Sequence, residues 1–356
     1  MHDRIEEGNT VTSPTAPSSP ARLPLPASVS IREVGMRDGL QIEAPITTEA
    51  KVSLLRALVA TGVPRLEATA FVSPRAVPSM ADAEAVADVV AELSAPGAPG
   101  AGVEFSALAA SPNGARRAVA AGLRTVEYVV SAAEGHSRAN ARRSTDEALE
   151  AVAEVADVVH GAGGRLEVII ATAWDCPFDG VVPTSRTAGV AARAVELGAD
   201  QLCLGDTIGT TSPARVVELV GAVRDAAGPV PLGAHFHDTR GTGIASALAA
   251  LLAGVDQLDA SVGGMGGCPF APGASGNIAT EALLYLLDDA GVSTGVDADA
   301  VLAAAGLAQR LVGHDLPSGL LRAGGRSRPR PLPEGTDPLA RRQTQQAVAA
   351  GAGSAR

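Results

Sequence analysis

The fold is decided by residues 165–235, where five segments of two kinds alternate: RLEVIIA (165–171), SRTAGVAARAVEL (185–197), QLCL (201–204), PARVVELVGAVRDAA (213–227) and VPLGAH (230–235). The first, third and fifth are short apolar runs, which are typical of buried strands. The second and fourth are rich in alanine and repeat their apolar residues at helical spacing. Strands and helices in this order predict parallel strands joined by helical connections.

The same alternation extends outward in both directions. Five more strand-like runs lie at residues 30–34, 65–69, 103–107, 125–130 and 257–261, and further helical stretches include residues 48–61 and 146–161. Eight strands alternating with helices predict an α/β protein, a closed parallel (β/α)8 TIM barrel. A doubly wound open sheet is the rival fold, but no glycine-rich dinucleotide fingerprint opens the first helix.

The two ends of the chain differ in composition from the part between them. Residues 1–28 are rich in Ser, Pro, Thr and Ala without periodicity, and residues 324–356 turn to Arg, Gly, Pro and Ala. Such segments bury too little apolar surface to fold, so we expect a disordered tail at each end. The remaining residues 29–323 are predicted to form one barrel domain.

Composition excludes several classes of function. The formal net charge is −11 and aromatic residues make up only 2% of the chain, which argues against a nucleic-acid-binding protein. No apolar run reaches the roughly 18 residues that a membrane span needs. The first residues lack an apolar signal core, and three cysteines do not form a disulfide framework. We therefore expect a cytoplasmic protein in a reducing compartment. Lys51 is the only lysine, so an imine-forming aldolase has almost no candidate nucleophile.

Polar, chemically active side chains stand at the ends of the predicted strands. The carboxyl ends of barrel strands converge on one face, where active sites of this fold are built, so we expect these side chains to share one cavity. They are Arg37 and Asp38 after the first strand, Glu67 in the second, Asp206 after the sixth, His235 and His237 at the seventh, and Cys268 and Asn277 after the eighth.

Four of these residues predict a metal site. His235 and His237 are two residues apart in a strand and therefore point to the same side. Asp38 adds a carboxylate and Asn277 an amide oxygen, and two nitrogens with two oxygens suit Mg²⁺ or Mn²⁺ better than Zn²⁺, which the ligand types do not exclude. The alternatives are a pair of surface histidines, an Arg–Asp surface pair in a turn, and an Asn277 that only caps the following helix.

Cys268 lies in the glycine-rich segment from Gly263 to Asn277. So many glycines predict a flexible or tightly bent loop. A thiol with an ordinary pKa near 8.5 is mostly protonated at neutral pH, so Cys268 can donate a proton as well as act as a nucleophile. The alternative is an inert cysteine in a linker. Of the other cysteines, Cys176 is expected to serve a structural loop and Cys203 to lie in the core.

The motif series resembles that of the 3-hydroxy-3-methylglutaryl-CoA lyase family. The matching stretches are RDGLQ (37–41), LEATAFVSPRAVPSM (66–80), LGDTIG (204–209), AHFHDT (234–239) and SVGGMGGCPFAPGASGNIATE (261–281). They occur in order between about residues 30 and 323. The Gly-Gly-Cys-Pro loop followed by Gly-Ala-Ser-Gly-Asn is specific to these lyases within the wider metallolyase superfamily.

The resemblance implies a TIM barrel that binds Mg²⁺ or Mn²⁺, takes an acyl-CoA substrate and commonly forms a homodimer. The implied reaction splits 3-hydroxy-3-methylglutaryl-CoA into acetyl-CoA and acetoacetate, a step of leucine degradation and ketone-body formation. By carry-over, Arg37 steadies the thioester enolate, Cys268 protonates the acetyl-CoA carbanion, and Gln41, Glu67 and Asp206 shape and polarise the site. The implied metal ligands are Asp38, His235, His237 and Asn277. Either His235 or Asp38 takes the hydroxyl proton, directly or through water.

Three departures from the family pattern bear on the acyl group. Ile42-Glu43-Ala44 lacks the family's basic residue, His136 replaces an aromatic residue, and Trp174-Asp175 replaces small ones. We expect these positions to line the acyl pocket, with His136 binding substrate.

A relative acting on citramalyl-CoA or a longer branched acyl-CoA is the second hypothesis for the function. A condensing synthase of the same superfamily is a third, but nothing after residue 324 can form its regulatory domain. A barrel that has lost its chemistry is a fourth, and every expected catalytic position is filled.

Overall fold

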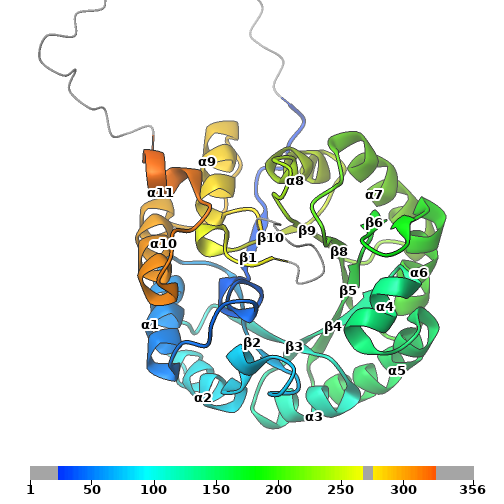
Figure 1. Ribbon diagram of the computed structural model, residues 1–356, viewed down its shortest axis with the longest axis horizontal. Coiled ribbons are helices and arrows are strands. Elements are labelled where there is room, and N and C mark those ends of the chain that lie inside the picture. Colours follow the sequence, from blue (N-terminus) through cyan, green and yellow to red (C-terminus); the bar gives the residue numbers. More distant parts are fainter. Residues whose placement is uncertain (1–22, 268–275, 326–356) are drawn as a thin grey trace, which may run out of the picture.

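The computed structural model describes residues 23–267 and 276–325. Its centre is a closed barrel of parallel strands in the order β1-β10-β9-β8-β5-β4-β3-β2 (Figure 1). The predicted (β/α)8 fold is therefore confirmed, with all eight strands within a few residues of their expected positions. The strands are β1 (Ser30–Glu33), β2 (Arg65–Phe71), β3 (Glu104–Ala109), β4 (Thr125–Ser131), β5 (Arg165–Ala171), β8 (Gln201–Asp206), β9 (Leu232–Phe236) and β10 (Gln257–Ala260).

Helices surround the barrel as an outer ring (Figure 1). They begin where the sequence supplies caps: Ser144 and Glu147 form a reciprocal capping box at α5, and Pro213 opens α7 at its first turn. Within the described residues the helices are α1 (Thr48–Val59), α2 (Ala83–Leu93), α3 (Pro112–Ala120), α4 (Glu134–Ala141), α5 (Thr145–Gly161), α6 (Thr184–Glu196), α7 (Pro213–Ala227), α8 (Gly243–Leu252), α9 (Thr280–Ala290), α10 (Ala298–Val312) and α11 (Gly319–Ala323). In those ranges, no helix combines the length and the apolar character that crossing a membrane requires.

Two boundaries differ from the sequence prediction for clear reasons. Strand β9 begins at Leu232, two residues later than expected, because Pro231 has no N–H to donate to the ladder. Residues 23–28 were assigned to the disordered tail, but the Ser293 N–H donates to the Ala27 carbonyl at 2.9 Å and Ser28 pairs with Ser293. For this short stretch the tail prediction is wrong. The rest of both predicted tails lies outside the described residues, apart from the two residues after α11.

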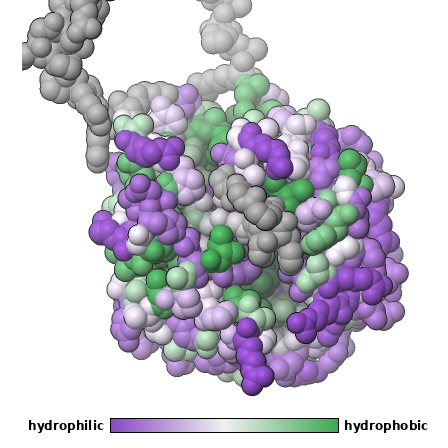
Figure 2. All heavy atoms as spheres, viewed as in Figure 1, coloured by the Kyte–Doolittle hydropathy of each residue, from purple (hydrophilic) through white to green (hydrophobic). Residues whose placement is uncertain are grey.

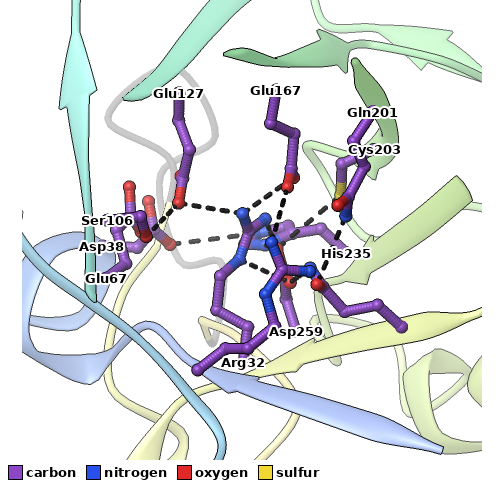
Figure 3. Close-up of polar contacts among 12 residues, drawn as sticks. Arg32, Asp38, Glu67, Ser106, Glu127, Glu167, Gln201, Cys203, His235 and Asp259 are labelled. Carbon is purple, nitrogen blue, oxygen red and sulfur yellow. Dashed lines mark hydrogen bonds and ion pairs between the residues drawn. The ribbon is translucent and has the colours of Figure 1, made fainter. Parts of the chain in front are cut away.

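The barrel has an apolar outside and a polar inside. Outward-facing strand residues such as Val126, Val130, Leu166 and Ile170 are fully buried under the helices. The alternate residues point inward, and instead of the branched apolar layers usual for this fold they include several charged side chains. Figure 3 shows five of this inward-facing group, Arg32, Glu127, Glu167, Gln201 and Asp259. Gln257 also belongs to it, and all six are buried.

Glu33 ties the end of β1 to the segments that follow β10. One carboxyl oxygen, Oε1, accepts hydrogen bonds from the backbone N–H groups of Gly35 and Val262, both at 2.8 Å. The other oxygen accepts from the Thr280 hydroxyl at 2.6 Å. Burial raises the pKa of Glu33 to about 7, although these hydrogen bonds oppose the rise.

We expect Glu33→Gln to change the pH dependence of stability. The folded pKa of about 7 lies above the unfolded value of 4.5, so the stabilisation from the proton is complete below pH 4.5 and is lost as the pH rises through 7. The variant cannot ionise. Between pH 5 and pH 8.5 the free energy of unfolding of the variant should therefore rise by about 2.5 kcal/mol relative to that of the wild type. Urea unfolding followed by the fluorescence of the single tryptophan measures this, and a constant difference across that range would contradict it.

Candidate active site

A cavity of about 120 Å³ opens at the carboxyl ends of the strands. Figure 2 looks onto one end of the barrel and shows mostly hydrophilic side chains on the surrounding helices, with more apolar residues around the hollow near the centre. The cavity brings together six of the residues that the sequence singled out. They are Arg37, Asp38, Gln41, His136, His235 and His237.

Arg37 and Asp38 stand on a single π-helical turn, Gly35–Gly39, directly after β1. The turn packs so closely that a Cβ at Gly39 would come within 2.9 Å of the Ser261 hydroxyl, which explains the glycine there. Such turns within helical segments are rare and are found mostly at functional sites. The turn aims both side chains of the Arg-Asp pair into the mouth of the barrel.

Arg37 is almost completely buried and is held by two carboxylates. Its Nε donates to Glu67 Oε1 at 2.5 Å, and its Nη1 donates to Asp38 Oδ1 at 2.7 Å. A longer contact of 3.3 Å joins Nη1 to Gln41 Oε1. Burial by itself lowers the pKa of Arg37, but the charges of Glu67 and Asp38 outweigh it and raise that pKa above its usual value. The guanidinium is therefore a fixed positive charge at the cavity wall.

Asp38, His235 and His237 form a three-residue cluster whose potential ligand atoms all lie within 4.8 Å of one another. The Nε2 atoms of His235 and His237 are 3.9 and 4.0 Å from the same oxygen, Asp38 Oδ2. Because β9 places the two histidines two residues apart, both rings emerge on one side, with centroids 5.1 Å apart. The predicted convergence of these three residues is confirmed.

The protonation states of this cluster suit a divalent cation. Burial would raise the pKa of Asp38, but Arg37 and the two histidines lower it to about 2, so the carboxylate is ionised at neutral pH. Burial and the neighbouring His235 lower the pKa of His237 to about 4, which leaves that imidazole neutral. A metal ion requires both of these forms. The residues present therefore fit a bound Mg²⁺ or Mn²⁺, with Asp38, His235 and His237 as the groups that would hold it.

Asn277 lies against the cluster from the other side of the barrel mouth. Its Nδ2 donates to Asp38 Oδ2 at 2.7 Å and to the Met265 carbonyl at 2.9 Å. Residues 237 and 277 also form an isolated antiparallel bridge. The structure thus places Asn277 beside the carboxylate with its amide nitrogen turned toward it, and its role as a metal ligand remains a prediction. It does not cap α9, whose N-cap residue is Ala279.

His136 lines the cavity from the first turns of α4. Its Nδ1 lies 2.7 Å from the Ser131 hydroxyl at the end of β4. Burial lowers the pKa of His136 to about 4, against a smaller opposing effect of Asp179, so the ring is neutral at physiological pH. Its predicted place beside the substrate is consistent with this position.

Two predicted site residues turn away from the cavity. Both carboxyl oxygens of Asp206 accept backbone N–H groups of the following loop, from Thr210 at 3.0 Å and Thr211 at 3.1 Å. In this arrangement Asp206 shapes the loop after β8, and its expected catalytic role stays a prediction. Trp174 was expected to line the acyl pocket, but it packs on Phe236 and donates to the Arg215 carbonyl at 3.2 Å.

Other sequence expectations have mixed outcomes. Ile42 is half exposed outside the cavity, so it does not line the pocket as expected. Cys176 and Cys203 are buried in the structural positions expected of them. Lys51 is buried and bonded to Ser79 and Asp82, which suits a structural lysine. Cys268 lies outside the described residues, so its proposed role rests on the sequence.

The sequence analysis missed the charged residues inside the barrel. Arg32, Glu127, Glu167 and Asp259 lie at buried, inward-facing positions of β1, β4, β5 and β10. Alternation with period two places each of them on the inner face once the strand is recognised. A charged residue at the third position of each of these four strands was therefore the signal that could have revealed them.

Comparison with known proteins gives consistent matches over most of the chain. The HMGL-like family model matches residues 28–307. The (R)-citramalyl-CoA lyase of Chloroflexus aurantiacus is 40% identical over 301 residues, covering 83% of this chain and 95% of that protein. The hydroxymethylglutaryl-CoA lyase of Pseudomonas mevalonii is 42% identical over 275 residues, covering 77% and 89%. A solved HMG-CoA lyase of Acinetobacter baumannii, in complex with coenzyme A and 3-methylmalate, has a TM-score of 0.80 at 35% identity and covers 86% of this chain and 98% of its own.

Proposed function

We propose a specific reaction from one premise, that this chain belongs to the HMGL-like family of lyases. The reaction is the divalent-metal-dependent cleavage of 3-hydroxy-3-methylglutaryl-CoA into acetyl-CoA and acetoacetate. The observation that carries it is the convergence of Asp38, His235 and His237 within 4.8 Å of one another, beside the fixed cation of Arg37. These are the groups that a retro-Claisen cleavage needs: a place for the hydroxyl oxygen and a cation for the thioester.

The cleavage has a simple balance of atoms and electrons. The tertiary hydroxyl passes its proton to His235 or Asp38, directly or through water. The neighbouring carbon–carbon bond breaks, and its electron pair moves onto the thioester as an enolate. When bound, a divalent cation supplies a Lewis acid beside the hydroxyl. Arg37 supplies positive charge that needs no reorganisation, because Glu67 and Asp38 already fix its guanidinium. The acetyl-CoA carbanion then takes a proton, and we assign that proton to the Cys268 thiol.

The test is acetyl-CoA release from 3-hydroxy-3-methylglutaryl-CoA by the purified protein with Mg²⁺ or Mn²⁺. We expect release that stops when EDTA removes the metal and returns when the metal is added back. Release that persists in EDTA would contradict the metal requirement. If the folded protein binds Mn²⁺ but releases no acetyl-CoA, then 3-hydroxy-3-methylglutaryl-CoA is not its substrate.

A second substrate is favoured by two observations. The Chloroflexus relative named a citramalyl-CoA lyase aligns over 95% of its own length. In addition, His136 stands in the cavity wall, where we expect the acyl group to lie. Citramalyl-CoA has one methylene fewer between the hydroxyl-bearing carbon and its carboxylate, and the same cleavage of it yields acetyl-CoA and pyruvate. Running both substrates in parallel, with acetoacetate and pyruvate measured separately, distinguishes the two.

We expect His136→Phe to change the preference between these two substrates. The substitution replaces a neutral polar ring with an apolar one and removes the contact with the Ser131 hydroxyl. The ratio of the two kcat/KM values should shift by about tenfold or more, the usual effect of one changed pocket contact. The matched control is His160→Phe, because His160 is partly exposed on α5, away from the cavity. An unchanged ratio in His136→Phe would remove this residue from substrate selection.

A further inference from the structure

Arg32 lies at the centre of the barrel, beneath the metal-binding cluster, with no exposure to solvent (Figure 3). Three carboxyl groups surround it. Its Nη1 is 2.8 Å from Glu127 Oε1 and 2.7 Å from Glu167 Oε1. Its Nε and Nη2 donate to the two oxygens of Asp259 at 2.9 and 2.7 Å. This two-point contact fixes the plane of the Asp259 carboxylate, because both groups are planar and both bonds must be kept.

Asp259 in turn reaches the metal-binding cluster. Its Oδ2 is 3.1 Å from His235 Nδ1 and also faces the Cys203 thiol at 3.7 Å. Its Oδ1 accepts from Gln257 Nε2 at 3.2 Å as well as from Arg32. Asp259 is therefore an acceptor surrounded by donors from Arg32, Gln257 and Cys203, and its close contact with the ring of His235 places a hydrogen on Nδ1.

We propose that Asp259, clamped by Arg32, is a positioning residue that holds His235 in the Nδ1–H tautomer with Nε2 directed at the metal site. The proposal rests on the proposed function in so far as it assigns a metal to that site. A histidine ligand whose second nitrogen bonds a carboxylate is fixed in tautomer and ring orientation, and its ligating nitrogen becomes more basic. Here that nitrogen is the one that lies 3.9 Å from Asp38 Oδ2.

Arg32 gives this arrangement its rigidity. Asp259 comes from β10 and Arg32 from β1, which are adjacent strands paired in register at these two residues. Glu127 on β4 and Glu167 on β5 hold the remaining side of the guanidinium from across the barrel. The orientation of one metal-binding histidine is thus tied to strands on both sides of the barrel interior.

The first test reads the tautomer of His235 directly. The full-length protein, freed of metal with EDTA and labelled with ¹⁵N, contains only six histidines to assign. Long-range ¹H–¹⁵N spectra at neutral pH should show Nδ1 of His235 protonated and Nε2 bare. A His235 that carries its proton on Nε2, or a mixture of both forms in the wild type, would overturn the proposal. This measurement needs no variant and no substrate.

The second test removes the carboxylate. Asp259→Asn keeps the shape of the side chain but offers a donor as well as an acceptor to His235. We expect the dissociation constant for Mn²⁺, measured by calorimetry, to rise 10- to 100-fold, the usual effect of losing such a partner. His235 should also show both tautomers. The matched comparison is Glu167→Gln, a change of carboxyl to amide in the same buried cluster but without contact to His235 in the structure. Because Glu167 reaches His235 only through Arg32 and Asp259, this variant should weaken Mn²⁺ binding by a clearly smaller factor than Asp259→Asn does.

Two outcomes of the variant experiment contradict the proposal. One is unchanged Mn²⁺ affinity in a folded Asp259→Asn protein, and the other is an equal loss in Asp259→Asn and Glu167→Gln, which would indicate a general loss of barrel integrity. If Asp259→Asn does not fold, Arg32→Lys keeps the charge, loses the two-point contact and should still weaken Mn²⁺ binding severalfold. None of these readouts uses an acyl-CoA, so failure of the proposed reaction and failure of this inference are distinguishable.

Discussion

Arg37→Gln is expected to lower kcat/KM for acetyl-CoA release on the order of 10³-fold, the loss typical of removing a preorganised donor to a developing oxyanion. The residue is 6% exposed and its side chain is held by Glu67 and Asp38, so its charge would act on the thioester without reorganisation. Glutamine retains hydrogen-bonding ability but not the charge. The steady-state rate with Mg²⁺ measures the effect. A loss of less than about tenfold would mean that another group stabilises the enolate.

The control for this variant separates catalysis from stability. Glu67 is fully buried, and without Arg37 it loses the cation at 2.5 Å from its Oε1. Breaking a buried pair by removing one partner costs about 3 kcal/mol of folding stability. The double variant Arg37→Gln with Glu67→Gln removes both charges and should recover most of that stability while the rate stays low. If the double variant also recovered the rate, the single variant would have lost activity through misfolding.

Cys268→Ala is expected to lower turnover by about 10² to 10⁴-fold, the range that a positioned general acid contributes. The prediction follows from the sequence, because the segment GGMGGCPFAPGASGN (263–277) resembles the cysteine loop of the family. Alanine removes the proton donor and changes little else. Steady-state release of acetyl-CoA measures the loss, and Mn²⁺ affinity should stay at the wild-type value because no metal ligand is altered.

The chain supplies its own matched control for this experiment. Cys176 also precedes Pro-Phe, but it is buried in the short strand β6 (Asp175–Cys176), and its sulfur accepts the Phe178 N–H at 3.4 Å. Cys176→Ala should leave the kinetics of acetyl-CoA release close to those of the wild type. Near-normal turnover in Cys268→Ala would remove that residue from the acid role, and another proton donor would have to be found.

Local sequence patterns were sufficient to place most of the site. The spacing of His235 and His237 puts both rings on one side of a strand, whatever the strand's neighbours are. The Arg37-Asp38 pair directly after the first strand had to lie at the carboxyl end of the barrel once the fold was recognised. Position along a strand is a local property, and for this reason the convergence of Asp38, His235 and His237 followed from the sequence.

The local sequence did not determine the direction in which individual side chains point. Asp206 stands at the end of β8 as predicted, yet its carboxylate turns onto two N–H groups of the next loop. Trp174 follows β5 but is covered by its contacts with Phe236 and Arg215. In both cases nearby backbone groups or packing partners offered a better arrangement than the cavity did. Motif matching gives the position of such a residue and not the orientation of its side chain.

The sequence by itself determined the number and order of the barrel strands, the face on which the site lies and the identity of its main charged groups. These features depend on the repeat of apolar residues, on the spacing of motif residues and on the direction of each strand, all of which can be found in short stretches of sequence. Only the tertiary structure decided what lies beneath the site. Arg32 and Asp259 are 227 residues apart and meet because the first and last strands close the barrel in register. The contact between Arg32 and Asp259 forms only when the barrel closes, so neither strand's local sequence predicts it.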